Sequence, residues 1–204
     1  MNIAVFASGR GSNFQAILTA INEGRLPARV TLLVSNNSNS GALELARSQK
    51  IPAIHLSQKQ CPSEERYVGQ LFELLERYEV DLIALAGYMK RVPTKVIERF
   101  RNKILNIHPA LLPAFGGAGM YGIHVHEAVI ASGARVSGAT VHIVDEEYDK
   151  GPIVMQKMVD VAPNDTAETL AARILPVEHE IYPKALAAFA QNRVRIEGRK
   201  VWIQ

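Results

Sequence analysis

Short, unbroken apolar runs alternate with amphipathic segments through the first half of the chain. Such runs are typical of parallel strands buried on both faces, whereas apolar residues that recur every three or four positions indicate a helix. The runs that predict strands are 2–7, 29–35, 53–56, 81–87 and 103–108. The segments that predict helices are 13–22, 41–50, 62–79 and 93–100. Strands and helices therefore alternate, as they do in parallel sheets with helical crossovers.

The pattern changes in the second half of the chain. A helical segment at 124–133 is followed by two longer, partly alternating runs at 135–144 and 152–161, which the acidic turn DEEYDKG joins. These runs predict two further strands, including an antiparallel edge.

A long helix is expected at 165–191. Asp165 or Thr166 is its expected N-cap. Pro176 and Pro183 lie within it, and we expect them to interrupt it, because proline lacks a backbone N–H and clashes with the preceding turn.

Together these elements predict an α/β fold. It is Rossmann-like, with a mostly parallel twisted sheet of about seven strands flanked by helices. The C-terminal segment 194–204 can form a hairpin that extends this sheet. No linker rich in proline or serine divides the 204 residues, so we expect a single domain over 1–204.

Composition and charge narrow the functional classes. The chain is 48% hydrophobic and 21% charged, and its formal net charge of +3 comes from dispersed Lys and Arg residues. A nucleic-acid surface needs a basic stripe and a membrane span needs roughly 20 apolar residues, so we expect neither partner. Cys61 is the single cysteine and MNIAVFASGR is too short for a signal peptide, so we expect a cytoplasmic location. We expect small-molecule substrates, for a monomer or a homodimer.

The loop SGRGSN after the first predicted strand indicates a phosphate site. Free backbone N–H groups and the helix dipole attract anions at such a position. Gly9 and Gly11 allow close approach to the backbone, and Ser12 and Asn13 add donors and a helix cap. Phe14 replaces the third glycine of a dinucleotide loop, and no acid ends the second strand, so a phosphate monoester fits better than NAD. A tight turn without a ligand stays open as the alternative.

Asn106 and His108 form a second candidate site. They stand at i and i+2, on one face at the end of a predicted strand, where α/β sheets bind substrates. Pro109 and Pro113 restrict the following backbone. Asp149 in the acidic turn can fix the imidazole tautomer and favour its protonated form. The group suits a general acid or an oxyanion stabiliser. A structural histidine and a solvated acidic turn are the alternative.

Three histidines raise the question of a metal site. His124 and His126 have a His-x-His spacing, and His142 lies in a later strand. No strong set of acidic or cysteine ligands accompanies them, so we expect no metal.

The segments ILNIHPALLPAFGG and GATVHIVDEEYDKGPIVMQ resemble the folate-dependent formyltransferases. The Asn-x-His-Pro-x-Leu-Leu-Pro run and the downstream Asp-x-Gly are the signature of that superfamily. NIAVFASGRGSNFQAI and LIALAGYMKRVP narrow the resemblance to the phosphoribosylglycinamide formyltransferases of purine synthesis. The resemblance extends from Met1 to about residue 190.

The resemblance implies an activity and a catalytic set. The family transfers the formyl group of 10-formyltetrahydrofolate to the amine of glycinamide ribonucleotide, which gives the N-formyl product and tetrahydrofolate in IMP synthesis. The formyl donor is a co-substrate, and no metal is needed. By resemblance, Asn106 and protonated His108 stabilise the oxyanion that forms when the amine attacks, and Asp149 supports His108 and assists proton transfer.

The resemblance also implies binding residues for both substrates. Contacts to glycinamide ribonucleotide map to Gly11, Ser12, Asn13, Gly87, Met89, Pro109 and Glu178. Contacts to the folate map to Met89, Lys90, Arg91, Val92, Asn106, Ile143, Val144, Asp145 and Asp149. The chain departs from some family members in a longer loop at 114–126, in Leu175 and in Glu64.

Three other functions serve as alternatives. A formyltetrahydrofolate hydrolase has similar catalytic residues and uses water as the acceptor, but normally carries an N-terminal regulatory domain. Methionyl-tRNA formyltransferase needs a C-terminal RNA-contacting domain, for which we expect no room after the last hairpin. A non-catalytic ribonucleotide- or folate-binding module would not require Asn106, His108 and Asp149 together. We therefore expect the transferase.

Overall fold

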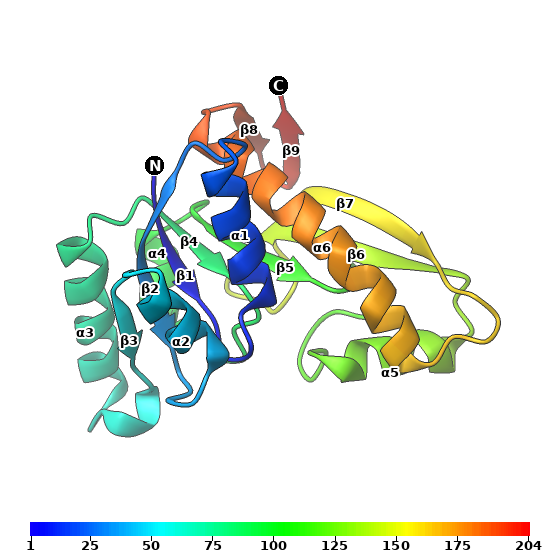
Figure 1. Ribbon diagram of the computed structural model, residues 1–204, viewed down its shortest axis with the longest axis horizontal. Helices are drawn as coiled ribbons and strands as arrows, with labels where there is room; N and C mark the ends of the chain where they lie inside the picture. Colours follow the sequence, from blue (N-terminus) through cyan, green and yellow to red (C-terminus); the bar gives the residue numbers. More distant parts are fainter. The chain divides into compact units, whose positions relative to one another are not determined.

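The computed structural model describes residues 1–204, which divide into two compact units, Met1–Leu105 and Asn106–Gln204 (Figure 1). The elements of the first unit are β1 (Asn2–Phe6), α1 (Ser12–Asn22), β2 (Arg29–Ser35), α2 (Gly41–Ser48), β3 (Ala53–His55), a 3-10 turn (Gln58–Gln60), α3 (Glu64–Arg77), β4 (Leu82–Leu85) and α4 (Thr94–Arg99). The chain passes from the first unit to the second within β5 (Ile104–His108). The second unit continues with α5 (Ile123–Ser132), β6 (Val136–Ile143), β7 (Ile153–Asp160), α6 (Ala167–Ala190), β8 (Val194–Glu197) and β9 (Lys200–Ile203).

Seven strands form one sheet in the order β3-β2-β1-β4-β5-β6-β7. The pairs β1–β2, β2–β3 and β1–β4 are parallel, and β6 pairs antiparallel with β7. The predicted α/β fold, its mostly parallel sheet and its antiparallel edge are thus confirmed. β4 is buried along its whole length, and β1 is buried after its first residue, which explains why these strands appear in the sequence as unbroken apolar runs.

The helices of the first unit each bury one face. α1 places Phe14, Ile17 and Leu18 at helical spacing, and all three side chains are buried. α3 buries Leu71 and Leu75 in the same way. A fully buried side chain of this kind stabilises the folded state by roughly 1.5–3 kcal/mol. Packing therefore contributes more to these helices than intrinsic propensity does.

α6 is the longest helix and packs against α5, β6 and β7 (Figure 1). The prediction that Pro176 and Pro183 interrupt it is wrong, because both prolines lie inside one continuous helix. Each proline removes a backbone N–H from the helix, and the buried side chains of Ile174 and Tyr182 offset this loss through packing. Neither α6 nor any other helix has the length and hydropathy of a transmembrane segment.

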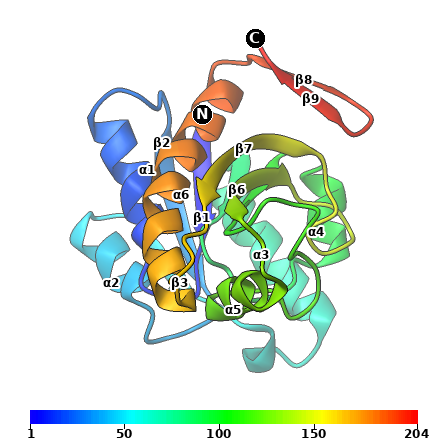
Figure 2. The same cartoon turned by 90° about the vertical axis from the view of Figure 1, so that its right-hand side faces the viewer.

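β8 and β9 form a two-stranded antiparallel sheet of their own. The expectation that this hairpin extends the main sheet is therefore wrong, and Figure 2 shows it as a separate ribbon beyond the end of α6. Both strands alternate between half-buried and exposed residues. They satisfy their ladder hydrogen bonds on each other, and neither has the continuous apolar face that a strand inside a layered sheet needs.

Thr166 is the N-cap of α6, as one of the two sequence-based candidates predicts. Its hydroxyl accepts from the Thr169 N–H at 3.3 Å, and the Thr169 hydroxyl accepts from the Thr166 N–H at 2.9 Å. This reciprocal pair is a capping box. Asp165 instead accepts from the Ala162 N–H at 2.7 Å and pairs with Arg173 at 2.8 Å.

Thr166→Ala removes the capping hydroxyl, and we expect the free energy of unfolding to fall by about 1 kcal/mol. Urea denaturation followed by circular dichroism measures this change. Thr94→Ala is the matched control, because Thr94 is an exposed residue at the start of α4 where no side chain caps the helix. It should stay within about 0.5 kcal/mol of the parent chain. An equal loss in both variants would contradict the assigned cap.

Candidate active site

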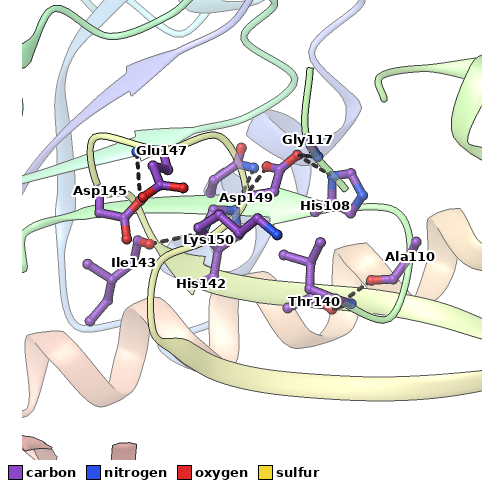
Figure 3. A network of polar contacts seen from close by, with 12 residues as sticks. His108, Ala110, Gly117, Thr140, His142, Ile143, Asp145, Glu147, Asp149 and Lys150 are labelled. Atoms are coloured by element: carbon purple, nitrogen blue, oxygen red, sulfur yellow. Dashed lines mark hydrogen bonds and ion pairs between the residues drawn. The ribbon is translucent and has the colours of Figure 1, made fainter. Parts of the chain in front are cut away.

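His108, at the end of β5, lies beside Asp149 in the second unit (Figure 3). The His108 Nδ1 atom is 3.7 Å from Asp149 Oδ2, and the two side chains are only 4% and 11% exposed. On the other side of the ring, Nε2 lies 2.8 Å from the Phe115 carbonyl oxygen. A carbonyl can only accept, so this contact assigns the proton to Nε2. At 3.7 Å, Asp149 is too far from Nδ1 for a hydrogen bond, so the contact that assigns the tautomer is the one to Phe115 and not, as the sequence predicts, the one to Asp149.

The loop after β5 also holds Asp149. Asp149 has a φ of 55° in the turn after β6, and its Oδ2 atom accepts from the Gly117 N–H at 2.9 Å. A side chain at Gly116 would collide with Leu112 and crowd the Cβ of Asp149. Glycine at this position therefore allows the loop to approach the carboxylate closely.

His142 is a third buried side chain of this group, and sequence reasoning missed its role. Its Nε2 atom is 3.4 Å from Asp149 Oδ1 and 3.1 Å from the Asn106 amide nitrogen. Its Nδ1 atom is 2.9 Å from the Ile143 carbonyl oxygen. The pairing of β6 with β7 shifts register between Val141 and His142, and such a bulge re-aims a side chain. Asn106 and His108 are thereby linked through His142 and Asp149.

Burial and local charges act on this pair in opposite directions. Burial lowers the pKa of His108, and although Asp149 and the Phe115 carbonyl raise it, the pKa stays below its ordinary value. Burial raises the pKa of Asp149, but hydrogen bonds from His142 and Gly117 and the charge of His108 bring it below its ordinary value. Asp149 favours protonation of His108, as the sequence predicts, but burial outweighs it. At neutral pH a carboxylate therefore lies beside a mostly neutral imidazole.

The predicted phosphate loop lies in the first unit, between β1 and α1. Gly11 is the N-cap of α1 with a φ of 87°, and no side chain caps the helix. The expectation that Ser12 or Asn13 provides this cap is therefore wrong, because the helix begins at Ser12 itself. α2, α3 and α6 have both a side-chain cap and an acidic residue in the first turn, whereas α1 has neither. Its first-turn N–H groups are thus not occupied by a capping side chain.

The loop after β4 is tied to the phosphate loop by Ser8. The Ser8 N–H donates to the Gly87 carbonyl at 3.0 Å, and the Met89 N–H donates to the Ser8 hydroxyl at 2.8 Å. Met89 is exposed, whereas Val92 is buried. The remaining predicted folate residues of this loop, Lys90 and Arg91, are exposed.

The other predicted binding residues belong to the second unit. Pro109 directly follows His108 and is half-buried. Ile143 is buried at the end of β6, and Val144 and Asp145 are half-buried in the turn that leads to Asp149. Glu178 is buried on α6.

The three histidines considered for a metal do not gather at one point. His124 is exposed and its Nδ1 atom lies 2.9 Å from Glu127. His126 is buried in α5, and His142 lies beside Asp149. No cluster of three or more His, Cys, Asp or Glu side chains has the arrangement of a metal site.

An α/β sheet of this strand order, with an Asn-x-His pair at the end of β5, is the frame of a formyl transferase. The chain belongs to the formyl transferase family, whose model matches residues 1–186 and so extends over both units. The chloroplastic phosphoribosylglycinamide formyltransferase of Vigna unguiculata is 48% identical over 94% of this chain. The phosphoribosylglycinamide formyltransferase of Bacillus subtilis is 40% identical over 90% of this chain and 91% of its own length. The chain spans 62% of the length of the Vigna protein.

A solved structure has the same fold. Glycinamide ribonucleotide transformylase 1 from Symbiobacterium toebii superposes with a TM-score of 0.93 at 43% identity, over 100% of this chain and 93% of that one. The family resemblance predicted from the sequence motifs is thus confirmed.

We expect Asp149→Asn to lower the pKa of His108 further, because the carboxylate is one of the groups that raise it. NMR titration of the imidazole signals measures this pKa. Asp160→Asn, at an exposed residue at the end of β7, is the control and should leave the titration unchanged. A His108 pKa that stays the same or rises in Asp149→Asn would contradict the proposed action of the carboxylate.

Proposed function

We propose that the chain transfers the formyl group of 10-formyltetrahydrofolate to the amine of glycinamide ribonucleotide, giving the N-formyl product and tetrahydrofolate in purine synthesis. The observation that carries this proposal is the buried pair of His108 and Asp149, connected to Asn106 through His142. It occurs in a chain related along nearly the whole length of the Bacillus subtilis phosphoribosylglycinamide formyltransferase. Formyl transfer needs this combination of an amide donor, an imidazole and a carboxylate.

In the proposed reaction, the amine nitrogen attacks the formyl carbon and the formyl oxygen becomes an oxyanion. Asn106 and His108 are the N–H donors proposed for that oxyanion, which preorganised donors stabilise most in a site with little water. When the tetrahedral intermediate collapses, the bond between the formyl carbon and N10 of the folate breaks, and that nitrogen takes the electron pair. A proton leaves the amine and a proton reaches N10, and Asp149 assists this exchange.

The low pKa of His108 fits this role. The Nε2–H of the neutral imidazole donates to the Phe115 carbonyl, and we propose that it turns to the formyl oxygen as charge develops there. As negative charge grows on the oxyanion, the imidazolium form becomes more favourable, and Asp149 beside Nδ1 stabilises that form. We therefore propose that His108 gains its positive charge during the reaction rather than before it, by taking at Nδ1 the proton that leaves the amine. It loses that proton again when N10 of the folate is protonated.

Binding of glycinamide ribonucleotide is proposed to begin at its phosphate. Gly11, Ser12 and Asn13 offer backbone N–H groups at the start of α1, where the helix dipole favours an anion. The remaining proposed contacts to this substrate are Gly87, Met89, Pro109 and Glu178.

The folate is proposed to contact Met89, Lys90, Arg91, Val92, Asn106, Ile143, Val144, Asp145 and Asp149. A flat heterocycle is recognised by apolar walls and a few placed polar groups, and this set offers both kinds. No metal takes part in the proposed reaction. The single domain, the cytoplasmic location and the choice between monomer and homodimer stay predictions.

We expect His108→Ala to lower formyl transfer per folded molecule by about a hundredfold or more, because the oxyanion loses a donor. The measurement is tetrahydrofolate release from 10-formyltetrahydrofolate with and without glycinamide ribonucleotide. His124→Ala is the matched control, because His124 is exposed and its charged partner is Glu127. This variant should keep full activity.

The assay distinguishes three functions: transferase, hydrolase and binding module. Release that depends on the ribonucleotide supports the transferase. Equal release without it would favour a hydrolase that uses water as the acceptor. No release, with both ligands bound, would favour a binding module. Near-normal turnover by His108→Ala would contradict the proposed role of the imidazole.

We expect Gly11→Ala to raise the KM for glycinamide ribonucleotide by about tenfold, because a φ of 87° strains an alanine and its Cβ would crowd Ala42. Steady-state kinetics measures the change, with the KM for the folate as an internal reference. Gly69→Ala, on α3, is the control, since its Cβ would also meet no atom within 4 Å and the residue lies outside the proposed site. Equal KM values for the ribonucleotide in both variants would contradict a phosphate site at Gly11.

A further inference from the structure

Thr140 lies in β6, two residues before His142, and its hydroxyl is fully engaged by the loop after β5. It donates to the Ala110 carbonyl at 2.6 Å and accepts from the Leu112 N–H at 3.0 Å. The side chain is completely buried. Figure 3 draws Thr140 and Ala110 together with the His108–Asp149 pair.

Gln156, on the neighbouring strand β7, completes the contacts. Its amide nitrogen donates to the Thr140 hydroxyl at 2.9 Å and to the Leu112 carbonyl at 2.9 Å. The Thr140 hydroxyl thus donates one hydrogen bond and accepts two, and both hydrogens of the Gln156 amide have an acceptor. The hydroxyl and the Gln156 amide nitrogen thus have all their partners within this group, although Gln156 itself is an exposed residue. These hydrogen bonds hold both side chains in one arrangement.

These hydrogen bonds hold the first part of the loop after β5. Three residues beyond Leu112, the Phe115 carbonyl faces His108 Nε2. Two residues further, the Gly117 N–H holds Asp149. If residues 110–112 moved, the carbonyl that fixes the His108 tautomer and the donor on the carboxylate would move with them.

We propose that Thr140 and Gln156 are positioning residues for formyl transfer: they hold residues 110–112 on β6 and β7, so that Phe115 and Gly117 keep His108 and Asp149 in their working arrangement. Neither side chain is assigned to substrate or to the reacting atoms. The expected effect on turnover rests on the proposed function. The expected effect on the geometry of His108 does not.

Thr140→Val keeps the shape of the side chain and removes the hydroxyl, and Gln156→Met removes the amide donor at similar length. We expect each change to lower kcat at least tenfold and to leave the KM for glycinamide ribonucleotide within about twofold, because small misplacements of catalytic groups are costly. Thr140→Ser restores the hydroxyl and should recover most of kcat. The double variant should lose less than the product of the two single losses, since both act on the same segment.

Thr31→Val is the matched control, because it removes a buried threonine hydroxyl at a position away from the candidate active site. Thr31 lies on β2, and its buried hydroxyl has no hydrogen-bond partner. Kcat per folded molecule should stay at the parent value in Thr31→Val. If Thr140→Val does not fold, Gln156→Met alone carries the test, because Gln156 is an exposed residue on the edge strand β7.

A second readout is independent of activity. The nitrogen NMR shifts of His108 report its tautomer, and we expect the Nε2–H form in the parent chain and a mixture in Thr140→Val and Gln156→Met. Parent-like shifts together with parent-like kcat in both variants would overturn the proposal, and so would equal losses in Thr140→Ser and Thr140→Val. If the parent chain shows no ribonucleotide-dependent formyl transfer, the proposed function fails, and the NMR shifts alone decide the positioning role.

Discussion

Asp149 carries a carboxylate that is almost withdrawn from water, and an unpaired charge in such a position costs several kcal/mol. Its oxygens lie against the Gly117 N–H and the rings of His108 and His142. These partners come from β5, the loop after it and β6. The cost of burying the charge is therefore offset only when all three segments are in place, which couples folding of the second unit to assembly of the candidate active site.

The backbone departs from regular geometry where it serves this carboxylate. The register of β6 and β7 shifts at His142, Asp149 has a positive φ, and Gly116 leaves room for the loop to approach. Such features are costly in isolation and persist where the surrounding contacts determine them. Around Asp149 these contacts are hydrogen bonds rather than apolar packing, which explains why polar side chains are numerous in this part of a buried sheet.

Two polar residues at i and i+2 in an apolar strand are the pattern that identified Asn106 and His108, and the same pattern occurs a second time in this site. Asn106 and His108 are the polar residues that interrupt the apolar strand β5. Thr140 and His142 have the same spacing in β6, but a histidine within an apolar strand is also typical of an ordinary core position. The hydrogen bond from Thr140 to Ala110 and the contact between His142 and Asp149 distinguish the two cases, and they join residues far apart in sequence.

The sequence by itself determined the α/β class, the seven strands, the antiparallel edge and the family, because these depend on local periodicity and on motifs of adjacent residues. It also identified Asn106, His108 and Asp149 as a candidate group. The tertiary structure decided that α6 continues through two prolines, that the last hairpin forms a sheet of its own, and that burial lowers the pKa of His108. Helix continuity, strand pairing and the pKa of a buried group depend on packing and burial by distant segments, and local sequence does not encode these.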